Sequence, residues 1–407
     1  MERTIQIKEF ITLHDIIYTP KRFNVIIGPQ ASGKSLLVKL DYFLLEVADS
    51  LLFQAIVEEQ RKNVFIKNIK ELFSKYFNKN VWKNYIFEIS FSFDRNYELI
   101  IKREKGKRDI DVFINKAFDD LRKTLLKEFR TKFKKEDPFF SAIEFLNRYL
   151  RNNYPHFFKN SVFIPAGRSY FANMDKSIYM ILEKNYRIDP FLIIFGSRFE
   201  NAKSMLEVDI DLLNMKIPKI DILVRNILQG TIVYSKEIEN IGIKRDEVFT
   251  EIYYTSSGQQ ESLPLILTLL VLLKKKHKIY EEIIVEEPEA HLFPVSQKAM
   301  MELLGYMYNQ NFNITITTHS PYIITAINNQ ILLQEMKDKI PKKSYLYELL
   351  DFAIEFDDVS AYSLEDGRLV DIKNYENRLI EGYTVDKVSE EFSTIFNELL
   401  EFEVKDD

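Results

Sequence analysis

The sequence contains no cysteine, and this absence excludes a large part of protein chemistry. Without cysteine the chain has no disulfide, no thiolate zinc site, no iron–sulfur cluster and no cysteine nucleophile. Redox chemistry is therefore not expected. Chains without disulfides are typical of a reducing cytosol, and we expect a cytoplasmic protein.

Glycine and proline are also sparse, with 11 and 12 residues in 407, which excludes collagen-like and low-complexity chains. Long apolar runs are missing too. The densest one, from Leu263 to Leu273, covers 11 residues, whereas a bilayer-spanning helix needs roughly 20. Residues 1–20 carry several charges where a signal peptide would have an apolar core. We expect a globular protein without a membrane partner.

No single charge sign dominates the chain. Its 56 basic and 61 acidic residues give a net charge of −5, which provides no general attraction to nucleic acid or to an anionic membrane. Hydrophobic residues make up 46% of the chain and aromatic residues 14%, enough to build a large core. At about 150 residues per domain, this length predicts two or three structural units.

The first chemical motif is Gly28–Ser35, GPQASGKS, which matches the P-loop pattern GxxxxGK[ST]. A buried strand is predicted before it, at Phe23–Ile27, and an amphipathic helix after it, from Ser35 to about Ala48. In such a loop, backbone amides enclose phosphates, the lysine neutralises them and the serine binds Mg²⁺. A chance match on a strand–turn–helix connection is the alternative, and the flanking elements disfavour it. The residues expected to bind a nucleoside triphosphate are Gly28, Gln30, Ala31, Ser32, Gly33, Lys34, Ser35 and Leu36.

A second motif places two carboxylates after the predicted strand Ile283–Val285. The carboxyl ends of strands are where α/β sheets bind ligands. We assign Glu286 to the Mg²⁺ ion and Glu287 to the attacking water, a division of labour that phosphoryl transfer requires. An acidic pair after a strand is usually a solvated turn or a helix start, but the P-loop in the same chain favours the catalytic interpretation.

His319 follows another predicted strand, Ile314–Thr317, in a turn rich in Thr and Ser that Pro321 closes. No metal-ligand spacing accompanies it among the five histidines, so we interpret it as a sensor of the γ-phosphate. The alternative is a helix-capping turn that happens to contain a histidine.

The segment Thr255–Glu261, TSSGQQE, precedes a helix predicted over Ser262–Leu273. Its small residues, Ser257 and Gly258, together with the helix N-terminus, predict a second phosphate-binding device. Taken alone, the segment is better explained as an N-capped core helix. One chain rarely needs two such devices for one triphosphate.

The rest of the chain predicts strands and helices with little further chemistry. A hairpin is expected over Tyr85–Phe93 and Tyr97–Arg103, and solvent-facing helices over Asp109–Arg151. The other expected elements are a strand at Ser161–Ile164, helices at Met174–Tyr186, Lys219–Leu228 and Val388–Leu400, polar strands within Ile232–Tyr254 and a hairpin at Val359–Ile372.

In their order along the chain, the four motifs resemble the ABC-type ATPase heads of the SMC, RecF and OLD (overcoming lysogenization defect) superfamily. The resemblance implies ATP as the nucleotide and an α/β fold, a mixed β-sheet flanked by helices. It also identifies Gly28–Ser35 as Walker A, Ile283–Glu287 as Walker B, Ala290–Pro294 as the D-loop and His319 as the switch histidine. The implied signature motif is Ser256, Ser257, Gly258, Gln259 and Gln260.

Four regions follow from this resemblance. We expect an N-terminal lobe with Walker A over residues 1–103, a mainly helical insertion over 104–229 that includes the strand at 161–164, and a C-terminal lobe over 230–335. A hairpin-and-helix appendage is expected over 336–407. Catalysis would fall to Glu287, Lys34 and His319, and Mg²⁺ to Ser35 and Glu286.

The wording of the motifs is closest to OLD-like ATPases of bacterial anti-phage systems, through "VEEPEAHLFP", "TTHSPYI", "SSGQQE", "FIPAGRS" and "DVSAYSLEDGRLVDI". In that family two copies bind ATP head to tail, so that Ser257 and Gly258 of one copy would meet the phosphate held by Lys34 and Ser35 of the other. The resemblance thus implies a homodimer, with a higher oligomer as an option. OLD nucleases carry a TOPRIM domain, and no such set of carboxylates follows His319.

The chain departs from the common pattern at three places. Glu286 stands where Walker B usually has aspartate, the signature reads SSGQQ in place of LSGGQ, and no Q-loop glutamine is evident. Turnover is therefore expected to be slow. Arg168 is a candidate for the region of the missing glutamine, and a surface arginine after a strand end is the alternative.

The resulting hypothesis is an ATPase that dimerises around ATP and holds or releases a separate effector, a nuclease or toxin as in PARIS-type or Septu-type defence systems. An alternative is a RecF-like or SMC-like clamp that grips DNA through basic runs at 102–108, 132–135 and 274–278. Each run is more simply a solvated face. A small-molecule kinase is a third possibility, which would need no signature acting on a second copy.

Overall fold

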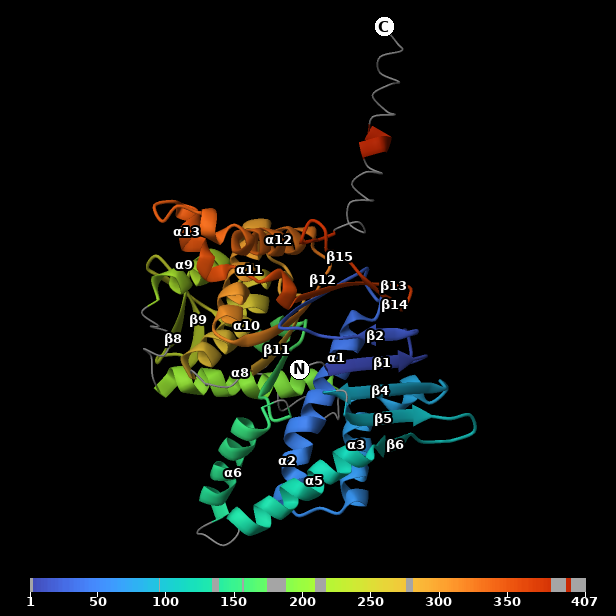
Figure 1. Ribbon diagram of the computed structural model, residues 1–407. Helices are drawn as coiled ribbons and strands as arrows, with labels where there is room; N and C mark the ends of the chain where they lie inside the picture. The colour runs from blue at the N-terminus through green and yellow to red at the C-terminus, as the bar shows by residue number, and fades with distance from the viewer. Residues whose placement is uncertain are drawn as a thin grey trace.

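The computed structural model describes residues 3–94, 96–133, 139–155, 157–173, 188–208, 217–275, 281–381 and 393–396. Its centre is a six-stranded sheet with the order β14-β13-β3-β12-β11-β7 (Figure 1). All of its neighbouring strands run parallel except β13 and β14, which form an antiparallel hairpin. The strands are β3 (Phe23–Ile27), β7 (Ser161–Ile164), β11 (Glu281–Glu286), β12 (Phe312–Thr318), β13 (Val359–Glu365) and β14 (Arg368–Asp371).

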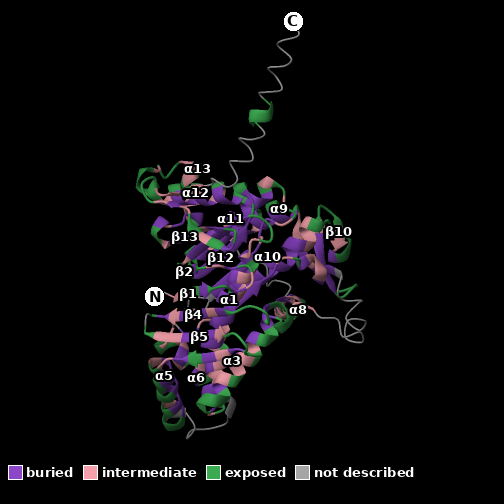
Figure 2. Ribbon diagram, turned by 90° about the vertical axis from the view of Figure 1, so that its right-hand side faces the viewer, coloured by how far each residue is buried: buried purple, intermediate pink, exposed green. Residues whose placement is uncertain are grey.

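Helices cover both faces of this sheet, which explains why strands such as β3 and β12 are buried at every position. Alternate residues of β3 face opposite sides. Val25 and Ile27 belong to one core, and Ile26 belongs to the other. Figure 2 shows the buried residues concentrated along these central strands and α1.

The core that contains Val25 is built with helices of the second half of the chain. In Figure 1 these helices fill the upper half of the molecule, with α8 along its lower edge. They are α8 (Pro190–Val208), α9 (Pro218–Leu228), α10 (Ser257–Lys275), α11 (Pro294–Asn309), α12 (Pro321–Glu335) and α13 (Tyr345–Leu349). Two small antiparallel sheets complete this half: β8 (Thr231–Ser235), β9 (Asn240–Arg245) and β10 (Val248–Glu251), and the pair β15 (Lys373–Asn374) and β16 (Leu379–Ile380).

The core that contains Ile26 lies between the central sheet and an antiparallel sheet of order β2-β1-β4-β5-β6. Its strands are β1 (Arg3–Lys8), β2 (Ile16–Tyr18), β4 (Phe87–Phe93), β5 (Tyr97–Arg103) and β6 (Asp111–Ile114). Its helices are α1 (Lys34–Glu46), α2 (Leu52–Val57), α3 (Lys62–Tyr76), α4 (Lys79–Trp82), α5 (Lys116–Glu128) and α6 (Phe139–Asn153). The predicted hairpin is confirmed as the antiparallel pair β4 and β5.

Three expectations about elements need correction. Residues 111–114 form strand β6 and not part of a helix, because Val112 and Ile114 are buried while Phe113 is exposed, a period of two within a charged stretch. The helix predicted to end near Ala48 continues through a π-helical turn, Val47–Leu51, into α2. The hairpin expected in a C-terminal appendage belongs to the central sheet, because β13 pairs in parallel with β3 from Val359 to Ser363.

Strand β7, expected within a helical insertion, also joins the central sheet beside β11. The fold class itself is confirmed as a mixed sheet flanked by helices around a P-loop. The helix expected at Met174–Tyr186 lies outside the described residues, as does most of Val388–Leu400, of which only the turn 393–396 is described and is helical. None of the helices that the structure describes is long and apolar enough to span a bilayer.

A buried ionic cluster joins the two sheets. Arg3 on β1 contacts Asp41 of α1 at 2.7 Å and Glu282 of β11 at 3.2 Å, and Lys159 contacts Glu282 at 2.6 Å. The Asn313 side chain donates a further hydrogen bond to Glu282. Burial alone would raise the pKa of Glu282, but Arg3, Lys159 and these hydrogen bonds outweigh it and lower the pKa to about 2. The carboxylate is therefore favoured in the folded chain.

This cluster predicts acid sensitivity of the fold. Because the pKa of Glu282 is depressed from 4.5 to about 2, its stabilising effect is present above pH 4.5 and is lost as the pH falls towards 2. We expect Glu282→Gln to lower the free energy of unfolding at pH 7 by about 3 kcal/mol and to flatten its decline below pH 4.5. Urea denaturation at pH 7 and pH 3 measures both effects. The control is Glu88→Gln, whose ion pair with Lys8 is exposed. An equal decline in Glu282→Gln and the unmodified chain would contradict the assignment.

Candidate nucleotide site

The P-loop forms the turn between β3 and α1, as the sequence predicts. Gly33 is the N-cap of α1 and has φ of 106°, a left-handed conformation that favours glycine. A Cβ at this position would lie 2.8 Å from Cδ2 of Leu13 and 2.9 Å from Oγ1 of Thr12. Both the backbone conformation and the space therefore require glycine. Ala31 in the same loop also has a positive φ, 63°.

Lys34 is held over this loop. Its Nζ donates hydrogen bonds to the carbonyl oxygens of Gly28, at 2.7 Å, and Pro29, at 2.8 Å. Burial lowers the pKa of Lys34, while the charges of Glu287 and Glu289 act in the opposite direction. The ammonium group thus lies within electrostatic reach of the second motif. Phosphate oxygens are stronger partners for it than backbone carbonyls.

Glu286, the last residue of β11, is a buried carboxylate with spare bonding capacity. Its Oε2 accepts a hydrogen bond from the backbone N–H of Ala166 at 3.1 Å, and its Oε1 has no hydrogen-bond partner in the described part of the chain. Burial raises its pKa, against which Lys39 and a hydrogen bond from the Ser35 side chain act. A buried carboxylate with an unused oxygen, at the same edge of the sheet as the Ser35 hydroxyl, fits the preference of Mg²⁺ for oxygen ligands.

Glu287 and His319 form a pair across two neighbouring strands. Glu287 Oε1 lies 3.1 Å from Nε2 of His319, and both side chains are partly exposed, at 31% and 40%. The parallel pairing of β11 with β12 aligns Glu286 with Thr317 and so brings the two motifs together. Glu287 has φ of 46°, a conformation that costs energy in a non-glycine residue and that clusters at functional sites. Its backbone N–H donates to the Thr317 carbonyl at 3.0 Å.

The third carboxylate of the VEEPE segment, Glu289, fixes the histidine turn. Glu289 Oε1 accepts hydrogen bonds from the Thr318 hydroxyl at 2.5 Å and from the His319 backbone N–H at 3.0 Å. Sequence reasoning assigned no role to Glu289. The signal was its position two residues after Glu287, because a buried carboxylate in this segment needs a hydrogen-bond partner.

Arg168 is the other residue whose place sequence reasoning missed. Its side chain is 1% exposed, so the interpretation as a surface arginine is wrong. The guanidinium donates to the carbonyl oxygens of Pro165, Glu286 and Glu287, at 2.8, 2.7 and 3.0 Å. It also donates from Nε to the Glu261 carbonyl at 2.9 Å. Arg168 therefore ties the end of β7 and the backbone of both site carboxylates to helix α10.

Glu261 completes this connection from the α10 side. Its carboxylate accepts from the backbone N–H groups of Arg168 and Ser169, at 2.9 and 3.0 Å, and lies 3.4 Å from the Arg168 Nε. None of these contacts of Arg168 and Glu261 involves a residue of the P-loop. Arg168 and Glu261 position backbone, and we assign no direct chemical role to either.

The signature segment forms the N-terminus of α10 as a capping box. The Ser256 backbone N–H donates to Oε1 of Gln259 at 3.1 Å, and the Gln259 backbone N–H donates to Oγ of Ser256 at 3.4 Å. Gln260 donates to the carbonyls of Tyr253 and Thr255. Ser256, Gln259 and Gln260 thus serve the local fold, as the N-cap alternative expected.

Ser257 and Gly258 remain available for another role. Ser257 is exposed at the first turn of α10, and a Cβ at Gly258 would lie 2.6 Å from the carbonyl oxygen of His291. Within the described residues no hydrogen bond or ion pair joins either residue to the P-loop of the same chain. The structure therefore brings together the P-loop, the two carboxylates and His319, whereas Ser257 and Gly258 make no hydrogen bond or ion pair to the P-loop within the described residues.

The shared edge of the sheet explains this grouping. The P-loop, the histidine turn, the carboxylate pair and Arg168 follow the carboxyl ends of β3, β12, β11 and β7, which are consecutive parallel strands. Ligands bind at this edge in open α/β sheets. Among the described residues no group of three or more His, Asp or Glu side chains could hold a metal by itself. A metal ion here would depend on Ser35, Glu286 and the phosphates of a ligand.

Comparison with known families points to the same chemistry. Residues 195–324 match the AAA ATPase domain family. The matched segment contains the signature, the carboxylate pair and His319, and the P-loop lies on its N-terminal side. The match indicates an ATPase domain over this part of the chain. No curated protein matches the chain in sequence.

Solved structures with a related arrangement are SMC head domains. An SMC head bound to the C-terminal winged-helix domain of ScpA is 13% identical, with 93% of this chain and 99% of that chain covered and a TM-score of 0.43. The SMC head of Thermotoga maritima is 11% identical, with 92% and 99% covered and a TM-score of 0.38. An SMC head with an extended coiled coil, bound to the C-terminal domain of ScpA from Pyrococcus furiosus, is 12% identical, with 96% and 99% covered and a TM-score of 0.38.

Proposed function

We propose that this chain binds and hydrolyses ATP, and that two copies close around the nucleotide. The observation that carries the proposal is the Glu287–His319 pair at 3.1 Å, at the same sheet edge as a P-loop whose lysine is within electrostatic reach of Glu287. A water-activating carboxylate and a phosphate-neutralising lysine are the two groups that ATP hydrolysis needs at one place.

Each residue has a role that its surroundings support. Lys34 neutralises charge on the phosphates, and its hold on two loop carbonyls keeps it at the loop. Ser35 and Glu286 would hold Mg²⁺, which supplies charge neutralisation at the phosphate oxygens. Glu287 accepts the proton of the attacking water. His319 orients Glu287 through their contact and reads the γ-phosphate, and Glu289 keeps the histidine turn in place.

The dimer is inferred from the signature segment. Ser257 and Gly258 lie at the N-terminus of a 19-residue helix, where backbone N–H groups and the helix dipole favour an anion. Neither residue contacts the P-loop of its own chain within the described residues. A phosphate held by a second copy is the ligand that would use this helix end, and the ABC-type resemblance supports the same pairing.

Ser257→Arg tests the composite site. An arginine at this exposed position would fill the space for the partner's phosphate while leaving the Ser256–Gln259 capping box intact. We expect hydrolysis to fall at least about 100-fold, because a group acting only in the closed dimer is lost, with ATP binding by the P-loop within about twofold. Phosphate release and equilibrium ATP binding measure the two effects. Full hydrolysis in a monomeric variant would refute the composite site.

We further propose that the ATP cycle holds or releases a separate effector, a nuclease or toxin, in anti-phage defence. The support for this step is the resemblance of the motifs to OLD-like ATPases. The test is to co-express the chain with a nuclease-like protein from the adjacent reading frame and to ask whether the two purify together only in one nucleotide state. Equal recovery with and without ATP would argue against a switch.

The described residues give little support to the alternative function, a clamp that binds DNA. In the basic run 102–108, Lys102 and Lys107 both pair with Glu104, and Lys107 also pairs with Asp111. These ion pairs reduce the charge available to phosphates. The runs at 132–135 and 274–278 lie largely outside the described side chains. Salt-dependent binding to duplex DNA in the presence of ATP would favour the clamp.

A further inference from the structure

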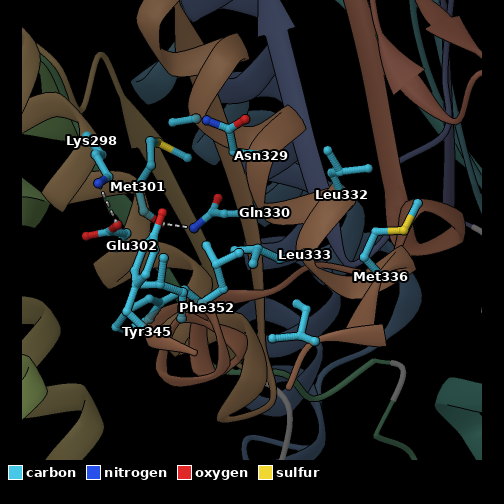
Figure 3. A pocket seen from close by; sticks show the side chains of 14 residues that line it. Lys298, Met301, Glu302, Asn329, Gln330, Leu332, Leu333, Met336, Tyr345 and Phe352 are labelled. Carbon is cyan, nitrogen blue, oxygen red and sulfur yellow. Dashed lines mark hydrogen bonds and ion pairs between the residues drawn. The ribbon is translucent and has the colours of Figure 1, made fainter. Parts of the chain in front are cut away.

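An apolar groove lies between α11, α12 and α13, away from the candidate nucleotide site (Figure 3). It encloses about 410 Å³ and continues along the segment that follows α12. Three of its polar side chains have partners in the wall: Lys298 pairs with Glu302 at 3.6 Å, and Gln330 donates to the Met301 carbonyl at 2.8 Å. The apolar lining consists mainly of Met301, Leu332, Leu333, Met336, Leu349 and Phe352.

The rim of this groove is basic. Met336 and Ile340, which line the groove, belong to a stretch that contains four lysines and one aspartate. All four lysines are exposed. They are Lys337, Lys339, Lys342 and Lys343. An occupant that suits this groove has an apolar stripe and carboxylates beside it.

The last part of the same chain has this chemistry. From residue 388 onward, apolar residues recur at helical spacing, and the opposite positions are largely acidic. The apolar stripe consists of Val388, Phe392, Ile395, Phe396 and Leu399, and the acidic residues beside or opposite it are Glu390, Glu391, Glu398 and Glu401. Beyond Leu399 the stripe no longer holds, because Leu400, Phe402 and Val404 alternate with Glu401, Glu403 and Lys405.

The described turn of this segment has no apolar cover. Residues 393–396 form a helical turn that stands apart from the body in Figure 1. Ile395 is 49% exposed and Phe396 is 63% exposed. These two neighbouring side chains form an apolar surface that is open in the described chain.

We propose that the groove binds the segment 388–400 of a second copy of this chain. The groove offers apolar walls and a lysine rim, and the segment offers an apolar stripe and carboxylates, so both the hydrophobic and the charged parts match. Ile395 and Phe396 are exposed on their own chain, so their apolar surface is open to a neighbouring molecule. The proposal involves neither ATP nor the signature segment and does not depend on the proposed function.

Such an interaction joins two different surfaces, a groove on one copy and a segment on the other. If each of two copies places its segment in the groove of the other, the two copies form a closed dimer. If each copy binds the segment of a different neighbour, the copies form a ring or an open chain. The described part of the chain before this segment is anchored on a helix of the groove, because Ile380 makes two hydrogen bonds to Asn328 of α12.

Single-cysteine copies test the proposal directly, since the natural chain has none. One copy carries Leu332→Cys in the groove, and a second copy, made heavier by a fused tag, carries Phe396→Cys. The two are mixed without nucleotide and treated with a short bismaleimide. We expect a cross-linked species that contains one heavy and one light chain. Because each chain has one thiol, this species can form only between molecules.

The matched control replaces Leu332→Cys with Phe113→Cys, since both native side chains are 48% exposed and Phe113 lies on β6. We expect at least tenfold more cross-link at the groove than at Phe113. Equal yields would show random collision and overturn the proposal. A chain carrying both Leu332→Cys and Phe396→Cys that cross-links only within itself would also overturn it, in favour of docking within one molecule.

Charge reversal provides a second measurement that does not require a thiol. We expect Lys342→Glu with Lys343→Glu to raise the dissociation constant of the nucleotide-free assembly at least tenfold in sedimentation, and Glu398→Lys with Glu401→Lys in the same chain to restore it in large part. An unchanged assembly in the lysine variant would contradict the proposed rim.

Discussion

Replacing Glu287 with glutamine should lower ATP hydrolysis by about 10²- to 10⁴-fold, the range typical of losing a general base. The amide keeps the shape of the side chain but cannot accept a proton from water. Binding of ATP should change little, since the P-loop is untouched, and the variant should accumulate as an ATP-bound dimer. Phosphate release, equilibrium ATP binding and light scattering with ATP measure the three effects.

The matched control for this prediction is Glu247→Gln. Glu247 has a side chain that is 96% exposed, lies in the turn between β9 and β10 and belongs to none of the site motifs. It should leave hydrolysis unchanged. Loss of activity in both variants, or in neither, would remove Glu287 from the mechanism.

Of the proposed substitutions, Arg168→Met should lower the free energy of unfolding the most. The fully buried guanidinium satisfies the carbonyls of Pro165, Glu286 and Glu287, and methionine would leave all three without this donor. It would also remove the charge next to the buried Glu261. Breaking a buried pair of this kind costs about 3–5 kcal/mol in the free energy of unfolding. Equilibrium denaturation in urea measures it.

Two further variants make this prediction specific. Arg148→Met, at a side chain that is 71% exposed, should change the free energy of unfolding by less than about 1 kcal/mol. Arg168→Lys keeps the charge but cannot reach several carbonyls at once, so it should recover only part of the loss. If Arg168→Met costs no more than Arg148→Met, the arginine does not hold this part of the site together.

Local patterns explain what could be predicted from the sequence. The P-loop, β3 and α1 follow one another within about 25 residues, and the spacing of glycines, lysine and apolar residues fixes their structure locally. The same holds for the capping box at Ser256, because its two partners are three residues apart. Strands β7, β11 and β12 were also predictable, since β7 and β11 contain short apolar runs and β12 alternates apolar and polar residues.

Pairings between distant segments explain what was missed. Arg168 has four acceptors that come from three separate parts of the chain, so nothing near it in sequence distinguishes it from a surface arginine. The place of β13 beside β3 depends on a pairing across more than 330 residues. Glu289 gains its partners only when β11 and β12 are side by side. The dimer, the effector and the roles of the site residues stay predictions.

The most direct test of the composite ATP site is a mixing experiment with two inactive variants. Lys34→Ala removes the phosphate-binding lysine, and Ser257→Arg blocks the signature helix. Each should be inactive alone. In an equal mixture about half of the dimers contain both variants, and each of these has one intact site, so activity should return to roughly a quarter of the natural level. A mixture that is no more active than its components would contradict a site shared between two copies.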